Sequence, residues 1–351
     1  MKLKAITIVA SAPFSASIAN AGEKLLGNFN SIKKLPTGEV YVSGQKMRHA
    51  LFSALDRVNG EDDDRGNTYV ANADGITDNL RNDLRADLGG YMQPKGEAYL
   101  GKRMSPVSAT FAIAKEPSQV FVDLLQRKSE RDAKDMTIAQ REVSAYDEMV
   151  YALHLDVDAV GVRHTDRYDK NNHVEKKTYA FIDKEEKRRR IRLFLEAAGQ
   201  LTAFSHSARN ANSAEPNEVF IVLDTRHSRK AIRLLHPKTT PQERENILAE
   251  LKSRGAQVFH GNDKTKQTPV KAAFDQALEA LKTAELNHPE GTPITVEDFK
   301  SRVTEALLSY REQKKKDEKK KNKTKGKTSG EVDESDDQEG TEEENGDADA
   351  A

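Results

Sequence analysis

Apolar residues recur along this chain with two different periods, which predicts a mixture of β-strands and amphipathic helices. Residues 3–10 alternate between apolar and polar side chains, as a half-buried strand does, and residues 149–157 show the same alternation. After Ser43 the apolar positions instead follow the period of a helix that packs one face on a core. These positions are Met47, Ala50, Leu51, Ala54, Leu55 and Val58. The pattern therefore predicts an α/β protein.

The rest of the chain continues this mixture of strands and helices. We expect strands at 35–42, 107–114, 218–223 and 256–260, and helices at 77–88, 118–128, 185–201, 228–235, 240–254, 268–284 and 295–313. On the helix at 185–201 we expect one basic set to be largely exposed, namely Lys187, Arg188, Arg189, Arg190 and Arg192. Strands and helices that are separated by insertions favour a ferredoxin-like or RRM-like α+β core over a continuous parallel sheet.

Composition narrows the class of protein. The 351 residues include no cysteine, which excludes disulfides, thiolate nucleophiles and cysteine-based zinc sites. The first residues imitate a secretory signal, but Thr7, Ser11 and Pro13 interrupt the apolar stretch. No other stretch approaches the roughly 18 apolar residues that a membrane-spanning helix needs. We therefore expect a cytoplasmic protein without a membrane partner.

The net charge of the chain is only −1, but the C-terminal tail is divided into a basic part and an acidic part. Lysines dominate residues 314–327, whereas residues 331–349 contain acids and no bases. Such segments bury too little apolar surface to offset the entropy of ordering, so we predict that 314–351 is disordered. The remaining body carries only a slight excess of basic residues. Any nucleic acid must therefore bind to a local basic surface.

The start of the helix after Ser43 is a candidate anion site. Ser43 is a suitable N-cap, and the helical period turns Gln45, Arg48 and His49 away from the core. Unpaired amides at a helix N-terminus carry partial positive charge, and Lys46 adds a full one. This arrangement predicts contact with a phosphate backbone.

A second candidate site consists of acids and histidines. Asp156 and Asp158 lie on one face of the strand at 149–157, and His164, Asp166, Asp169 and His173 follow closely. Such groups could hold a metal ion that activates water for phosphodiester cleavage. Basic residues interleave with them, however, so mutual salt bridges are the competing interpretation. Both interpretations remain open from the sequence.

Four segments of the chain together resemble the DevR family of CRISPR-associated autoregulators. They are the loop with Asn20 after the first strand, the pattern Ser43, Gln45 and Arg48, the segment 102–106 before a strand, and the segment 201–223. The resemblance implies an RRM-like palm with inserted fingers and a thumb loop. Residues 1–58 would begin the palm, 59–180 would form the fingers and the central palm strands, and 181–313 would complete the palm with a thumb at about 201–217.

The resemblance also implies a function. Members of this family are non-catalytic CRISPR RNA-binding subunits that polymerise head to tail along the guide and form the backbone of type I, here I-B-like, Cascade complexes. The implied partners are CRISPR RNA, the target DNA strand paired to the guide, further copies of the chain and other Cascade subunits, with no cofactor or metal. The implied RNA-binding residues are Asn20, Ser43, Gln45, Lys46, Arg48, His49, Ser205, His206, Arg209, Asn210 and Asn212.

The sequence leaves two alternative functions open and argues against one kind of RNA contact. A metal-dependent RNA-processing enzyme would use Asp156, Asp158 and the nearby histidines. An autoregulator would bind duplex DNA, although nothing resembles a helix-turn-helix with a basic recognition helix. The chain has no tryptophan and no closely spaced run of aromatic residues on a strand. Stacking of bases on an aromatic platform is therefore not predicted.

Overall fold

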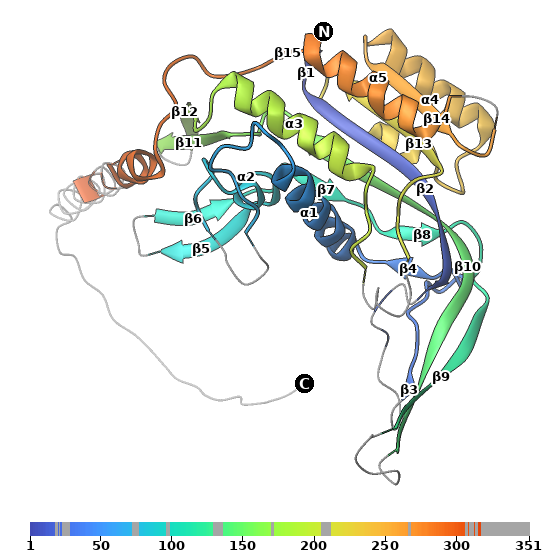
Figure 1. The fold of residues 1–351 in the computed structure, drawn as a ribbon. Helices are drawn as coiled ribbons and strands as arrows, with labels where there is room; N and C mark the ends of the chain where they lie inside the picture. The colour runs from blue at the N-terminus through green and yellow to red at the C-terminus, as the bar shows by residue number, and fades with distance from the viewer. Residues whose placement is uncertain are drawn as a thin grey trace, which may run out of the picture.

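The computed structural model is a mixed α/β protein, as the sequence predicts (Figure 1). It describes residues 1–17, 20, 22, 29–71, 77–95, 99–128, 136–169, 172–204, 212–265, 268–305, 308, 312 and 315–316. Nearly all of the predicted tail at 314–351 lies outside these residues, as do residues 205–211 of the predicted thumb. Within the described part of the chain, no helix is both long and apolar enough to cross a membrane.

A central sheet of nine strands organises the described residues. Its main path runs β14 (Gln257–Asn262), β13 (Glu218–Asp224), β2 (Ala5–Ser17), β10 (Met136–Asp156), β8 (Ala112–Ala114) and β4 (Tyr41–Val42). These neighbours are antiparallel, with Ile8 opposite both Leu153 and Ile221. Three further strands pair with β10, namely β3 (Phe29–Asn30), β7 (Val107–Ala109) and β9 (Val120–Lys128). The long strand β10 is thus the common partner of most of the sheet.

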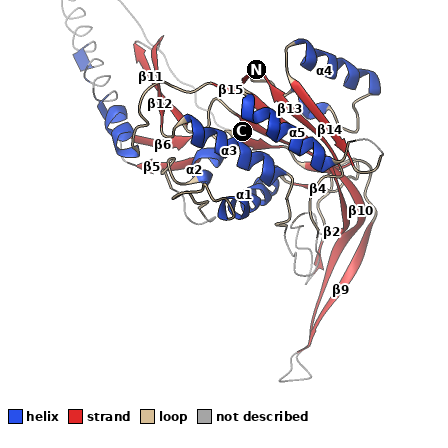
Figure 2. Cartoon of the chain, turned by 45° about the horizontal axis from the view of Figure 1, so that its top comes forward, coloured by secondary structure: helices blue, strands red, loops and turns tan. Residues whose placement is uncertain are grey.

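Helices cover both faces of this sheet because successive strand residues point to opposite sides. Ile8 and Ile221 belong to the larger core, which includes residues of α1 (Gly44–Gly60), α3 (Lys184–Ala198) and α5 (Val270–Thr283). Their neighbours Val9 and Phe220 face a second core formed with α4 (Pro241–Ser253) and the short 3₁₀ helix Lys230–Arg233. Figure 2 shows α4 and α5 on opposite sides of β13 and β14.

The main elements follow a β-α-β-β-α-β succession. In chain order they are β2, α1, the short strands β7 and β8, which pair with successive parts of β10 and together count as one strand, then β10, α3 and β13. The two crossing helices, α1 and α3, contact each other on the same face of the sheet. This succession is compatible with the predicted ferredoxin-like core. The boundaries of palm, fingers and thumb stay a prediction.

Smaller elements project from this core. They are β1 (Lys2–Leu3) paired with β15 (Glu285–Leu286), β5 (Tyr91–Lys95) paired with β6 (Tyr99–Arg103), β11 (Val162–Asp169) paired with β12 (Asn172–Ala180), and the short helix α2 (Leu84–Gly89). The ribbon of β9 and the first half of β10 extends away from the body (Figure 1). Residues 296–305 are helical, and Phe299 packs there against Phe181.

Some predicted elements are wrong in type or extent. The helix expected at 118–128 is strand β9, because its residues pair along their length with β10 rather than closing local helical bonds. The strand expected at 35–42 is reduced to β4, preceded by a bridge between Lys34 and Val40, since a turn occupies 36–38. Helix 77–88 shortens to α2, and helix 228–235 is a single 3₁₀ turn.

The expectation that the basic side chains of α3 are exposed is also wrong for three of the five. Lys187, Arg189 and Arg190 are buried, and the Arg190 side chain is 0% exposed. Lys187 donates its ammonium to the carbonyls of Asp158 and Asn287, and burial lowers its pKa to about 8. These three side chains therefore face inward, and Lys187 and Arg190 join α3 to loops of the chain.

A buried charge cluster around Asp87 joins four parts of the chain. Its carboxylate, which is 0% exposed, accepts hydrogen bonds from the guanidinium groups of Arg103 on β6 and Arg190 on α3. It also accepts the backbone N–H of Gly161, at 2.9 Å. Arg190 further donates to the carbonyl of Leu80, at 2.8 Å. These bonds fix α2 against α3, β6 and the turn that follows β10.

We expect Asp87→Ala to lower the free energy of unfolding by about 3 to 5 kcal/mol, because it leaves two buried guanidinium groups without their counter-charge. Asp63→Ala, at an exposed acid in the loop after α1, is the matched control and should change it by less than about 0.5 kcal/mol. Denaturant unfolding followed by circular dichroism measures both. Equal stabilities of the two variants would contradict the structural role of Asp87.

Candidate nucleic-acid interface

Helix α1 begins as the sequence predicts. Ser43 is its N-cap in an extended conformation, and the Ser43 hydroxyl accepts the backbone N–H of Lys46 at 3.3 Å. The predicted apolar stripe is buried from Met47 to Leu55, with Val58 half-buried at its end. Gln45 and His49 are exposed on the opposite side. The polar face of the first two turns is thus available to a ligand.

This face lines a cavity of about 630 Å³ between α1 and the end of α2. Its lining residues are Ser43, Gln45, Lys46, Arg48, His49, Phe52, Arg85, Gly89 and Gly90. The structure therefore brings together five of the six predicted RNA-binding residues near the N-terminus. Its lining contains the basic side chains of Lys46, Arg48, Arg85 and His49, and no carboxylate. We call it the cationic cavity.

Two arginines in the cationic cavity share one aromatic ring. The guanidinium carbons of Arg48 and Arg85 lie 5.9 and 5.5 Å from the centroid of the Phe52 ring. Arg48 also donates to the carbonyl of Gly89 at 2.7 Å and to the hydroxyl of Ser105 at 3.2 Å. Stacking on the ring and these two bonds fix the guanidinium of Arg48 at the wall of the cavity.

The charges in the cationic cavity destabilise one another. Burial, and then the charge of Arg85, lowers the pKa of Arg48. Burial lowers the pKa of Lys46, and burial followed by the charges of Lys46 and Arg85 lowers the pKa of His49. A bound anion would relieve this repulsion and would favour the protonated form of His49. The cavity is therefore suited to phosphate groups.

Sequence reasoning missed Arg85 and Phe52. Phe52 lies on α1 but does not belong to the predicted apolar stripe, and Arg85 comes from α2, far along the chain. Only the tertiary contact between α1 and α2 places them together. Charge alone would not have singled out Arg85, because arginines are common throughout the sequence.

Two other predicted RNA-binding residues lie elsewhere and have backbone partners. The Asn20 amide donates to the carbonyls of Lys33 and Tyr41, at 2.9 and 2.8 Å, and its oxygen accepts the N–H of Lys33. The Asn212 side-chain oxygen accepts the N–H of Ser15 at 3.0 Å. Their contact with RNA stays a prediction. The remaining four, Ser205, His206, Arg209 and Asn210, lie outside the described residues.

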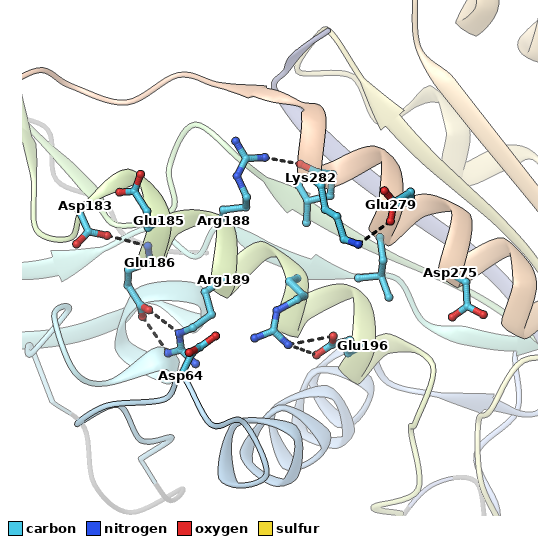
Figure 3. A pocket seen from close by; sticks show the side chains of 13 residues that line it. Asp64, Asp183, Glu185, Glu186, Arg188, Arg189, Glu196, Asp275, Glu279 and Lys282 are labelled. Carbon is cyan, nitrogen blue, oxygen red and sulfur yellow. Dashed lines mark hydrogen bonds and ion pairs between the residues drawn. The ribbon is translucent and has the colours of Figure 1, made fainter.

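A larger pocket, of about 760 Å³, lies between α3 and α5 (Figure 3). More carboxylates than cationic side chains line it. Its arginines already have partners: Arg189 pairs with Glu186 and Arg192 with Glu196, while Arg188 donates to the carbonyls of Leu281 and Ala284. This pocket is therefore a poor site for a phosphate backbone, although it is the larger of the two.

The predicted acid and histidine site is partly assembled. Asp156, Asp158 and His164 line a cavity of about 610 Å³, together with His227, which the sequence did not point to. The His227 ring lies 2.9 Å from the carboxylate of Asp158 and 3.4 Å from that of Asp156. In the part of the chain that the structure describes, no three acids or histidines are arranged to hold a metal ion. The side chains of Asp166, Asp169 and His173 lie outside that part.

Fold and site together define an α/β protein with a carboxylate-free cationic cavity at the N-terminus of a helix. A family model described as CRISPR-associated negative auto-regulator DevR/Csa2 matches residues 8–226. The match spans more than half of the chain, and the chain belongs to this family. The resemblance predicted from the sequence is thereby confirmed.

Solved structures share the fold. A chain titled CRISPR RNA-guided surveillance complex matches with a TM-score of 0.52 and 14% identity, over 79% of this chain and 99% of that chain. A second, titled CRISPR RNA-guided surveillance complex, pre-nicking, gives a TM-score of 0.50 and 13% identity, again over 79% and 99%. No curated protein matches the sequence.

We expect Arg85→Gln to raise the pKa of His49, because it removes a positive charge that disfavours the imidazolium. Titration of the imidazole resonances by NMR measures this pKa in the wild type and in the variant. Arg57→Gln, on the last turn of α1 and outside the cavity lining, is the control and should leave it unchanged. An equal rise in both variants would contradict the proximity of Arg85 and His49.

Proposed function

We propose that this chain is a non-catalytic CRISPR RNA-binding subunit of a type I Cascade DNA-surveillance complex. One observation carries the proposal: five of the residues to which the family resemblance assigns RNA binding line one cavity, which contains basic side chains and no acid. Membership of the DevR/Csa2 family supports it. So does the fold shared over almost the full length of chains from CRISPR RNA-guided surveillance complexes.

The cationic cavity suits the sugar-phosphate backbone of an RNA strand. Arg48 and Arg85 offer guanidinium groups that pair with phosphate oxygens, and Ser43 and Gln45 offer hydrogen bonds to phosphate or ribose. Backbone contacts carry no sequence information by themselves. A guide bound in this way keeps its bases available for pairing with a target DNA strand, as in other RNA-guided systems.

Head-to-tail association of copies along the guide completes the proposal. Packing one surface of a subunit against a different surface of the next generates an open helical assembly. The length of RNA and the other Cascade subunits would then limit the number of copies. A modest affinity at each cationic cavity suffices, because linked contacts along one strand multiply the overall affinity.

Binding of single-stranded RNA should weaken steeply with salt, and Arg85→Gln should reduce the salt dependence. For single strands, the slope of log K against log salt is about −0.7 for each neutralised phosphate. We expect the variant to lose about 0.7 from the magnitude of this slope for each bound copy, measured by fluorescence anisotropy. Arg226→Gln, an exposed arginine outside the cavity, should leave the slope unchanged. Salt-independent binding by the wild type would contradict the proposed function.

Purification of the tagged protein from its native host in mild salt should recover a discrete population of guides flanked by CRISPR repeats. Sequencing of the RNA that comes with the protein identifies this population. We expect Arg48→Glu to lose the guides, because it places a carboxylate against the phosphates, whereas Arg226→Glu should retain them. Recovery of heterogeneous RNA, or of none, would contradict the proposed function and favour the two alternatives, an RNA-processing enzyme or a DNA-binding autoregulator.

A further inference from the structure

Two aromatic rings stack on each other at the surface beside the start of α1. The rings of Tyr41 on β4 and Phe111, just before β8, are nearly parallel, at 10°, with their centroids 5.3 Å apart. This is an offset-stacked pair. Phe111 is 47% exposed, so the pair is not part of the core. A large apolar ring that is supported on one side and open to solvent on the other is a candidate binding surface.

The aromatic pair is linked through the backbone to the residues that begin the cationic cavity. Tyr41 precedes Ser43, which lines the cavity, by two residues, so about 7 Å of backbone at most separates them. The segment before Phe111 presses against the first residue of α1. A Cβ added to Gly44 would lie 2.7 Å from the carbonyl oxygen of Ala109. Glycine at this position permits the close approach.

Hydrogen bonds fix the backbone that carries both rings. Asn20 donates to the carbonyl of Tyr41 at 2.8 Å. The hydroxyl of Thr110 donates to the carbonyl of Phe111 at 3.0 Å and accepts the N–H of Ala152, on β10, at 2.8 Å. The pair is thus attached to the central sheet. A platform fixed before binding loses little conformational entropy when a ligand stacks on it.

We infer that Phe111, supported by Tyr41, stacks against one base of the RNA strand whose backbone lies in the cationic cavity. This inference rests on the proposed function and adds a contact to a base. Every nucleobase presents a flat π-face, so stacking on an aromatic ring tolerates any sequence. A phosphate site next to an exposed aromatic ring is the combination that non-specific single-strand binding uses.

Stacking of a base on Phe111 differs from what the sequence predicts. The absence of a closely spaced aromatic run argued against an aromatic platform. In the structure, Tyr41 and Phe111 come from distant parts of the chain and meet only because β4 and β8 are neighbours, with Tyr41 opposite Ile113. The platform is thus a product of strand pairing.

We expect Phe111→Ala to weaken the binding of single-stranded RNA by roughly 5- to 150-fold at fixed salt while the salt slope stays unchanged, because stacking releases no counterions. Phe111→Trp, which keeps a flat ring, should retain the affinity. Phe121→Ala, which removes an equally exposed ring (47%) on β9, is the matched control and should bind as the wild type does. Equal affinity of Phe111→Ala and Phe121→Ala would overturn the inference.

A base-specific probe separates this inference from the proposed function. RNA that carries 2-aminopurine should lose fluorescence on binding to the wild type, and less so on binding to Phe111→Ala. Loss of self-association in Phe111→Ala, with unchanged RNA affinity and quenching, would make the ring a protein contact and overturn the inference. Failure of the wild type to bind RNA with a salt slope would instead reject the proposed function.

Discussion

The buried carboxylate of Asp87 is the interaction on which the arrangement of the candidate site depends. Removing a charge from water costs several kcal/mol, and only a complete set of partners offsets that cost. Asp87 has such a set, with Arg103, Arg190 and the N–H of Gly161 around its two oxygens. Because these partners come from β6, α3 and the turn after β10, they hold α2 in a single position. That position is the one that places Arg85 beside α1.

The geometry of the cationic cavity depends on this attachment of α2 through Asp87. One wall is α1, whose apolar stripe packs on the sheet, and the other is the end of α2 with the backbone of Gly89 and Gly90. Gly90 has a φ of +70°, and an added Cβ would lie 2.5 Å from the carbonyl of Arg103. Only glycine fits this approach. The repulsion among the cations is thereby maintained by the fold before any anion arrives.

The sequence predicts what depends on local periodicity and misses what depends on tertiary contact. The N-cap at Ser43, the buried stripe of α1 and the strand character of β10 all follow from neighbouring residues, and the structure confirms them. The half-buried strand expected at 3–10 is instead buried on both faces from Ala5 to Ala10, because helices cover both sides of the sheet. The helix expected at 118–128 fails because pairing with β10 overrides local preference. Burial of Arg190 and the position of Arg85 both require Asp87, whose partners lie far apart in sequence. From the sequence, therefore, only the part of the candidate site that lies on α1 could be predicted.

A protein that holds guides of varying sequence must bind every base equally well while retaining affinity. Guanidinium groups and hydroxyls that contact the backbone satisfy this requirement, since phosphates are the same at every nucleotide. A direct hydrogen bond to a base edge would not, because it would favour some guides over others. A stacking surface is the one kind of base contact that avoids the conflict, as all four bases present a similar flat face. A carboxylate-free cavity and an exposed aromatic ring, whose backbone is attached to the central sheet, therefore suit a strand that is recognised by its phosphates and by the flat faces of its bases, and not by its sequence.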